Sequence, residues 1–171
     1  MKAEFLMLRL VHILGGIFWV GGMMYSSFFL VPVLRSSPAV AGQVMVGLQR
    51  RRLFVILPIV ALLTMASGIR LLMITSAGFS DAYLSTISGR TYSAGAVAAI
   101  VAFLLAVVVS RPAFVHVGKL SASLATTTDE GGKQRITAEI QRLNRRATVA
   151  NTIVVVLLLF TAMSMATARY L

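Results

Sequence analysis

Cysteine is absent from this chain of 171 residues, and charged residues make up only 12% of it. The first absence excludes disulfide bonds, thiolate metal sites, iron–sulfur clusters and covalent haem attachment through a C-x-x-C-H motif. The second excludes an ordinary soluble domain, in which roughly a quarter of the residues are charged. Carboxylates are also scarce, and all five lie in termini or in connections between apolar blocks: Glu4, Asp81, Asp129, Glu130 and Glu139. The sequence therefore shows no converging carboxylate pair for general acid–base catalysis.

Long apolar runs account for most of what is present, since 58% of the residues are hydrophobic. A membrane-spanning helix needs about 20 mostly apolar residues. Four stretches are long enough: residues 5–31, 53–75, 92–110 and 147–168. We therefore expect an all-α fold, an integral membrane four-helix bundle that forms a single domain over residues 1–171. Short amphipathic helices are expected in the cytoplasmic connections.

The net charge of +11 comes from basic residues that lie beside the apolar runs. This arrangement indicates contact with anionic lipid headgroups and control of topology, and it argues against nucleic acid as a partner. We number the four spans in chain order. The connections between spans 1 and 2 and between spans 3 and 4 hold eleven of the sixteen basic residues, while the termini, the connection between spans 2 and 3 and the nearby span ends hold five. The positive-inside rule then predicts a multi-pass protein with both termini outside.

Two patterns predict helices in the basic connections. Ser37-Pro38 is typical of a helix start, with a capping serine and proline at the first helical position. Apolar residues then recur at four-residue spacing, at Val40, Val44 and Leu48. The 3–4 connection breaks at residues 129–132 and is followed by a second apolar stripe, at Ile136, Ile140 and Leu143. Such stripes suit helices that contact the membrane surface.

One face of the first span carries an unusual set of residues. His12, Gly15, Trp19 and Gly22 lie three or four positions apart and so share one side of a helix, with Arg9 one turn further out. An ionisable residue inside a membrane span is a candidate functional residue. Glycines allow a helix or a flat ligand to approach the backbone closely. The pattern predicts an interior face that can accept a planar guest.

The same level of the bundle offers further groups suited to haem b. At a rise of ~1.5 Å per residue, His12 lies ~10 Å below the outer end of its span, near the levels of Arg70 and Met163. A thioether can join an imidazole on haem iron, and the guanidinium groups of Arg9 and Arg70 could bind the propionates. His116 is expected ~20 Å or more from this level, outside the site. In the fourth span, a buried Asn151 is expected to hydrogen-bond across helices.

The spacing H-x2-G-x3-W-x-G-G resembles the first helix of the HemJ-type protoporphyrinogen IX oxidases; here it is formed by His12, Gly15, Trp19, Gly21 and Gly22. The resemblance continues at Arg52-Leu53-Phe54 and at Leu143-Asn144. CopD-type copper proteins have a similar first helix. The resemblance implies a protein of the bacterial inner (plasma) membrane with a four-helix core, a bound haem b, and His12 as an axial ligand.

The sequence also departs from the HemJ-type pattern. Phe28 and Val33 stand where that family has an arginine and a histidine, and the third span contains no lysine. These departures argue against protoporphyrinogen oxidation. The remaining interpretation is a membrane haem-b protein with a redox or electron-transfer role; an enzyme of this kind would be a haem-dependent membrane oxidoreductase whose catalytic residues the sequence does not identify.

Two other functions stay open, together with structural interpretations of the same residues. Imidazole and thioether groups also suit Cu(I), and a copper path could use the methionines Met23, Met24, Met65, Met163 and Met165. Alternatively, the chain is a non-catalytic accessory subunit whose glycine face packs on another chain. The expected partners are membrane lipids and either a second copy or a redox subunit. The two outer arginines could instead extend to the headgroups, and the methionines could fill the core.

Overall fold

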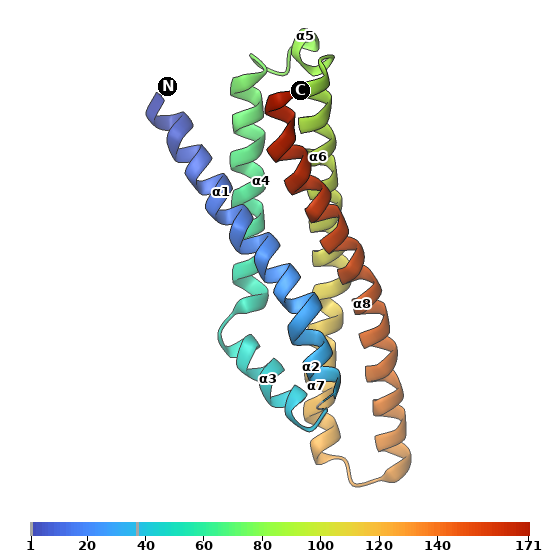
Figure 1. Cartoon of the computed structure of the whole chain (residues 1–171). Helices are drawn as coiled ribbons and strands as arrows, with labels where there is room; N and C mark the ends of the chain where they lie inside the picture. Colours follow the sequence, from blue (N-terminus) through green and yellow to red (C-terminus); the bar gives the residue numbers. More distant parts are fainter. Residues whose placement is uncertain (1, 37) are drawn as a thin grey trace.

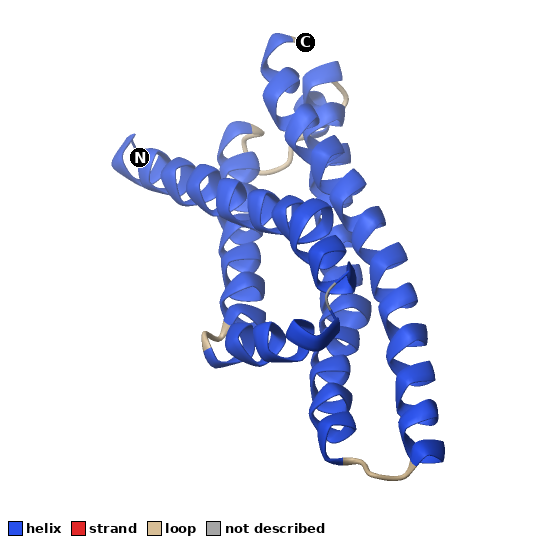
Figure 2. Ribbon diagram, turned by 60° about the horizontal axis from the view of Figure 1, so that its bottom comes forward, coloured by secondary structure: helices blue, strands red, loops and turns tan. Residues whose placement is uncertain are grey.

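The protein is all-helical in the computed structural model, which describes residues 2–36 and 38–171 (Figure 1). The described residues contain helices and connections and no strand (Figure 2). The elements in chain order are α1 (Lys2–Tyr25), η1 (Ser26–Leu30), α2 (Val31–Ser36), α3 (Pro38–Arg50), α4 (Leu53–Thr75), α5 (Asp81–Leu84), α6 (Ile87–Leu105), η2 (Ala106–Ser110), α7 (Arg111–Thr126), α8 (Glu130–Thr167) and η3 (Ala168–Tyr170).

Four helical segments of the described chain are long and apolar enough to cross a membrane, which confirms the expected bundle. They run over Lys2–Ser36, Leu53–Thr75, Ile87–Thr126 and Glu130–Tyr170. The second segment has the bounds that the sequence predicts. The other three extend beyond the predicted spans, because helical backbone continues into the polar connections at their ends.

Two of these long segments contain a five-residue π-helical stretch, and each stretch precedes a proline at the same offset. η1 ends two residues before Pro32, and η2 ends two residues before Pro112. A proline ring removes a backbone donor and collides with the carbonyl four residues earlier. A wider π turn accommodates such a residue within a continuous helix. The prolines therefore do not end these helices.

Both termini and the 2–3 connection, which includes α5, lie at one end of the molecule (Figure 1). The short helix α3 and the break before α8 lie at the other end. α3 begins at Pro38, as predicted, while the predicted capping residue Ser37 lies outside the described residues. The stripe of Ile136, Ile140 and Leu143 does not form a separate short helix, because α8 runs unbroken from Glu130 to Thr167.

The buried core lies at mid-height, where α1, α4, α6 and α8 meet. Its cluster of buried residues is Trp19, Met23, Ala61, Ala102, Val154, Val155 and Leu158. Small residues bring α6 and α8 close together: a Cβ added to Gly95 would lie 3.0 Å from Cβ of Ser164. Asn151 is 4% exposed and donates from Nδ2 to the hydroxyl of Ser27, which confirms the expected bond between helices.

Candidate functional site around His12

His12 lies on α1 with its imidazole against α4. Its Nδ1 is 2.7 Å from the backbone carbonyl oxygen of Thr64. The ring also fills the space beside Gly68, one helical turn further along α4: a Cβ built there would lie 2.6 Å from Cε1 and 2.8 Å from Nδ1 of His12. Any larger residue at position 68 would have to displace the imidazole. Gly68 therefore provides the space that this ring position requires.

The contact with Thr64 determines which imidazole nitrogen carries the proton. A carbonyl oxygen can only accept, so Nδ1 must be the protonated donor, and in a neutral imidazole the lone pair is then on Nε2. Metal-ligating histidines commonly donate their second ring N–H to a backbone carbonyl or a carboxylate in this way. The His12–Thr64 pair thus leaves Nε2 chemically suited to act as a ligand.

The glycine face of α1 packs on α4. A Cβ at Gly15 would lie 2.3 Å from Oγ1 of Thr64, and one at Gly22 would lie 3.2 Å from Cδ1 of Leu57. Close helix packing therefore accounts for the small size of both residues. A role for either glycine toward a planar guest stays a prediction.

Trp19 is part of the protein core. It is 3% exposed, and its ring makes an edge-to-face contact with Phe103 of α6, with centroids 6.3 Å apart. The interior orientation that its mid-span position predicts is confirmed. Trp19 and Met23 are the buried residues of α1, so the N-terminal part of this helix, including His12, lies beyond the tightly packed core.

The two arginines predicted at the outer rim have different surroundings. Arg9 is exposed on α1. Arg70, on α4, forms an ion pair with Glu4 of α1, with Nη2 at 2.8 Å and Nε at 3.1 Å from the same carboxylate oxygen. Both side chains are about half exposed. The ends of α1 and α4 that lie near the chain termini are therefore joined by a charge pair, and a second anion would have to compete with Glu4 for Arg70.

The methionines do not gather around His12 as one set. Met163 is 66% exposed on the outside of α8, so the structure gives no support for pairing it with His12. Met165 packs toward α6, where its Cε lies 3.4 Å from a Cβ added to Gly95. Three others, Met23, Met24 and Met65, belong to or contact the core cluster. Among residues 2–36 and 38–171, no group of three or more His, Cys, Asp or Glu side chains could hold a metal ion.

His116 lies on α7 and is exposed, on the helix that continues α6 toward the end of the molecule opposite the termini, which we call the basic end. The contacts of His12, in contrast, come from two residues of α4 that the pattern around His12 does not indicate, Thr64 and Gly68. The stretch Thr64–Gly68 includes a threonine, an alanine, a serine and a glycine within one apolar span. Such small and polar residues are typical of positions where another helix approaches, so this signal was available in the sequence.

Scans against protein-family models, curated proteins and solved structures find no match to this chain.

Proposed function

We propose that this membrane protein binds haem b, with Nε2 of His12 as an axial ligand. The observation that carries the proposal is the bond from Nδ1 of His12 to the Thr64 carbonyl, because it holds the imidazole in the form that ligates iron. The position of the ring in the membrane-spanning part of α1 adds support, since ionisable groups there are candidate functional residues. Arg9, one turn further out and exposed, would be available to bind a propionate.

A bound haem would supply one-electron redox chemistry. The chain's own contribution would be to fix the orientation of the imidazole through Thr64 and to leave room for that imidazole beside Gly68. A hydrogen-bonded histidine is also a more basic ligand, which tunes the iron to which it binds. This division of roles between the haem and the chain suits an electron-transfer or redox subunit of a bacterial inner (plasma) membrane, and it requires no converging carboxylates.

The test is an absorbance spectrum of the full chain, purified in detergent from cells supplied with a haem precursor. The wild type is expected to show a Soret band, and His116→Asn should retain it. His12→Asn is the informative variant, because an asparagine amide can still donate to Thr64 from the place of Nδ1 while nothing replaces Nε2. It should lose the Soret band and keep the thermal stability of the haem-free wild type.

Two results would overturn haem binding: a wild type without a Soret band, or an unchanged band in His12→Asn. If the wild type lacks a band and His12→Ala reduces co-purification with another membrane protein, the imidazole is part of a scaffold in an accessory subunit. Loss of stability in His12→Ala together with normal stability in His12→Asn would show how much the interhelical hydrogen bond contributes by itself.

Copper handling is a second candidate because three methionines, Met23, Met24 and Met65, belong to or contact the core cluster that contains Trp19. Thioethers favour Cu(I). Elemental analysis after loading with Cu(I) tests this role. A copper content near one per chain that falls in a Met23→Leu/Met65→Leu variant would support it, and a content near zero in the wild type would exclude it.

A further inference from the structure

A large hollow lies at the end of the molecule opposite the two termini. It has a volume of about 1090 Å³ and is bounded by α2, α3, α7 and α8. Figure 1 shows α2, α3 and α7 gathered at this end, with α8 alongside. Pockets for small ligands usually measure about 300–1,000 Å³. The hollow is therefore large enough for a molecule with a long apolar body, and it is remote in the chain's architecture from His12 on the N-terminal part of α1.

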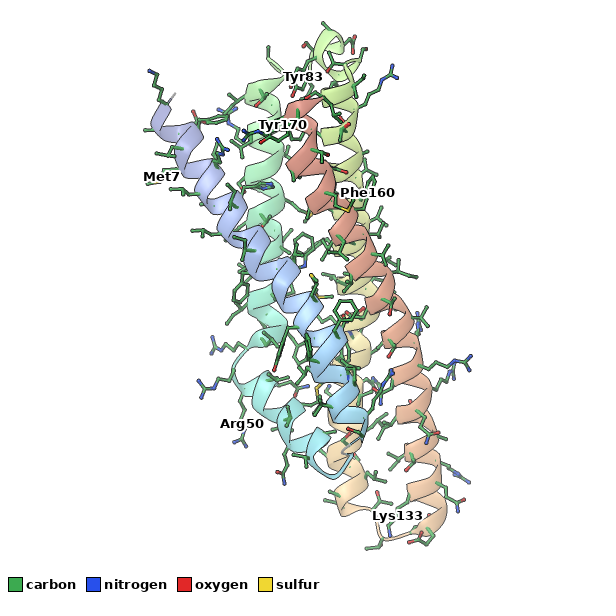
Figure 3. All side chains as sticks on the ribbon, viewed as in Figure 1. Met7, Arg50, Tyr83, Lys133, Phe160 and Tyr170 are labelled. Carbon is green, nitrogen blue, oxygen red and sulfur yellow. The ribbon has the colours of Figure 1, made fainter. Side chains whose placement is uncertain are left out.

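Charge of one sign surrounds this hollow. Three arginines from three helices line it: Arg35 of α2, Arg50 of α3 and Arg145 of α8. The described lining residues include no Asp or Glu. Figure 3 shows Arg50 on α3 at the same end of the molecule as Lys133. The arginines therefore favour an occupant that carries negative charge.

Arg35 is held in place by α8. Its Nη2 donates to the carbonyl oxygen of Asn144, at 3.3 Å, and to the hydroxyl of Thr148. These contacts bring the guanidinium beside the backbone of Arg145, the residue that follows Asn144. A guanidinium has five N–H donors, and the contacts with Asn144 and Thr148 use only those on Nη2. The donors on Nε and Nη1 take no part in these two contacts. Arg35 and Arg145 both line the hollow, and arginine binds phosphate bidentately.

Apart from these arginines and several neutral polar residues, the walls of the hollow are apolar. Aliphatic and aromatic side chains from all four helices contribute, among them Val31, Leu34, Met45, Val46, Phe114 and Val117. A small inorganic anion would leave this surface uncovered. An occupant with a phosphate at one end and hydrocarbon behind it matches both the arginines and the walls, and basic pockets between membrane helices bind phospholipid headgroups elsewhere.

We propose that this hollow is a binding site for one anionic phospholipid, with its phosphate at Arg35 and Arg145 and an acyl chain between α3 and α7. The site differs from general contact with headgroups, because it lies between helices and holds a lipid that survives purification. The lipid joins α2 and α3 to the α7–α8 pair at the basic end of the bundle. This assignment does not depend on haem binding at His12.

Native mass spectrometry of the delipidated full chain in detergent tests the proposal. Phosphatidylglycerol and phosphatidylcholine with the same acyl chains are titrated separately, and inorganic phosphate serves as the anion without a chain. Phosphatidylglycerol is expected to bind at one per chain and more tightly than phosphatidylcholine, and phosphate should not compete at lipid concentrations. Equal binding of the two lipids, or equal competition by phosphate, would overturn the proposal.

Two double variants lose the same positive charge, one inside the hollow and one outside it, and their phosphatidylglycerol binding is compared. Arg35→Gln/Arg145→Gln should weaken phosphatidylglycerol binding about 30-fold, because each arginine near an anionic lipid contributes a factor of about five. Arg51→Gln/Arg135→Gln removes the same charge outside the lining residues and should change binding less than about threefold, since surface charges remote from a site act weakly. Equal losses in the two double variants would refute the site.

Arg35→Gln also removes the contacts with Asn144 and Thr148, so further variants guard against a loss of folding. Arg145→Gln alone should weaken binding about fivefold. Val46→Trp fills the hollow without a change of charge and should remove bound phosphatidylglycerol, while helical content by circular dichroism stays at the wild-type value. Normal lipid binding in a folded Val46→Trp protein would also overturn the proposal.

Discussion

Gly68→Ala is the substitution that tests the geometry around His12 most directly. The new Cβ would lie 2.6 Å from Cε1 of His12, while contacts under 3.4 Å are already tight for real Cβ atoms. The imidazole must therefore move by about 0.8 Å, the difference between these two distances. A shift of that size lengthens the 2.7 Å contact with Thr64 to as much as 3.5 Å, where a hydrogen bond is no longer effective.

The energetic terms oppose each other. Replacing glycine by alanine inside a helix stabilises it by ~1 kcal/mol. Overpacking costs ~1–3 kcal/mol, and a lost hydrogen bond between membrane helices costs ~0.6 kcal/mol on average. We expect Gly68→Ala to lower the free energy of unfolding by about 1–2 kcal/mol. The matched control is Gly21→Ala, which meets nothing within 4 Å and should stabilise the protein by up to ~1 kcal/mol.

The measurement is unfolding in mixed detergent micelles, followed by far-ultraviolet circular dichroism. A double-mutant cycle isolates the contact: in a His12→Ala background the ring is gone, so Gly68→Ala should become stabilising by ~1 kcal/mol. The two substitutions should therefore be coupled by about 2–3 kcal/mol. If Gly68→Ala has the same effect with and without the imidazole, the packing of His12 on α4 described above is wrong.

Three further predictions concern other contacts. Gly89→Ala should destabilise the protein by about 3 kcal/mol in the same assay, because its Cβ would lie 2.2 Å from the carbonyl oxygen of Tyr83. This backbone atom cannot move aside as easily as the end of a side chain can. Glu4→Gln should cost less than ~1 kcal/mol, since its ion pair is half exposed, and 0.5 M salt should remove the difference. Ser27→Ala should cost about 1–2 kcal/mol because it leaves Asn151 buried without its acceptor, and adding Asn151→Val should recover most of that loss in unfolding measurements.

The sequence predicted most of the fold because long apolar runs have few alternatives to spanning helices. Residues 53–75 matched the observed α4 because the arginines at 50–52 and the turn after Thr75 mark both of its ends. The third span was predicted to end at Ser110, before Arg111-Pro112. The helix instead continues to Thr126, because a π turn accommodates the proline, and no pattern in the sequence marks such a turn.

The candidate site was only partly predictable. His12 stood out because ionisable residues are rare in membrane spans, but its partner Thr64 is 52 residues away in the chain. Matching depths along the helices predicted Arg70 near the level of His12 but gave no indication of its ion pair with Glu4. Depth fixes the level of a residue and not the rotation of its helix. The contact of His12 with Gly68 depends on that rotation, so it required the three-dimensional structure.

The π turn in the third segment has a consequence for which side of α7 meets its neighbours. Two α-helical turns span about seven residues, so counting from the buried Ala102 leads to Val109 and then to His116. The buried residues are instead Ser110 and Val117, each one position later. The extra residue in η2 shifts by one position which later residues of the helix face the neighbouring helices. Without that single added residue, the packed side of α7 would present His116 in place of Val117, and a titratable ring would have to be buried among apolar side chains.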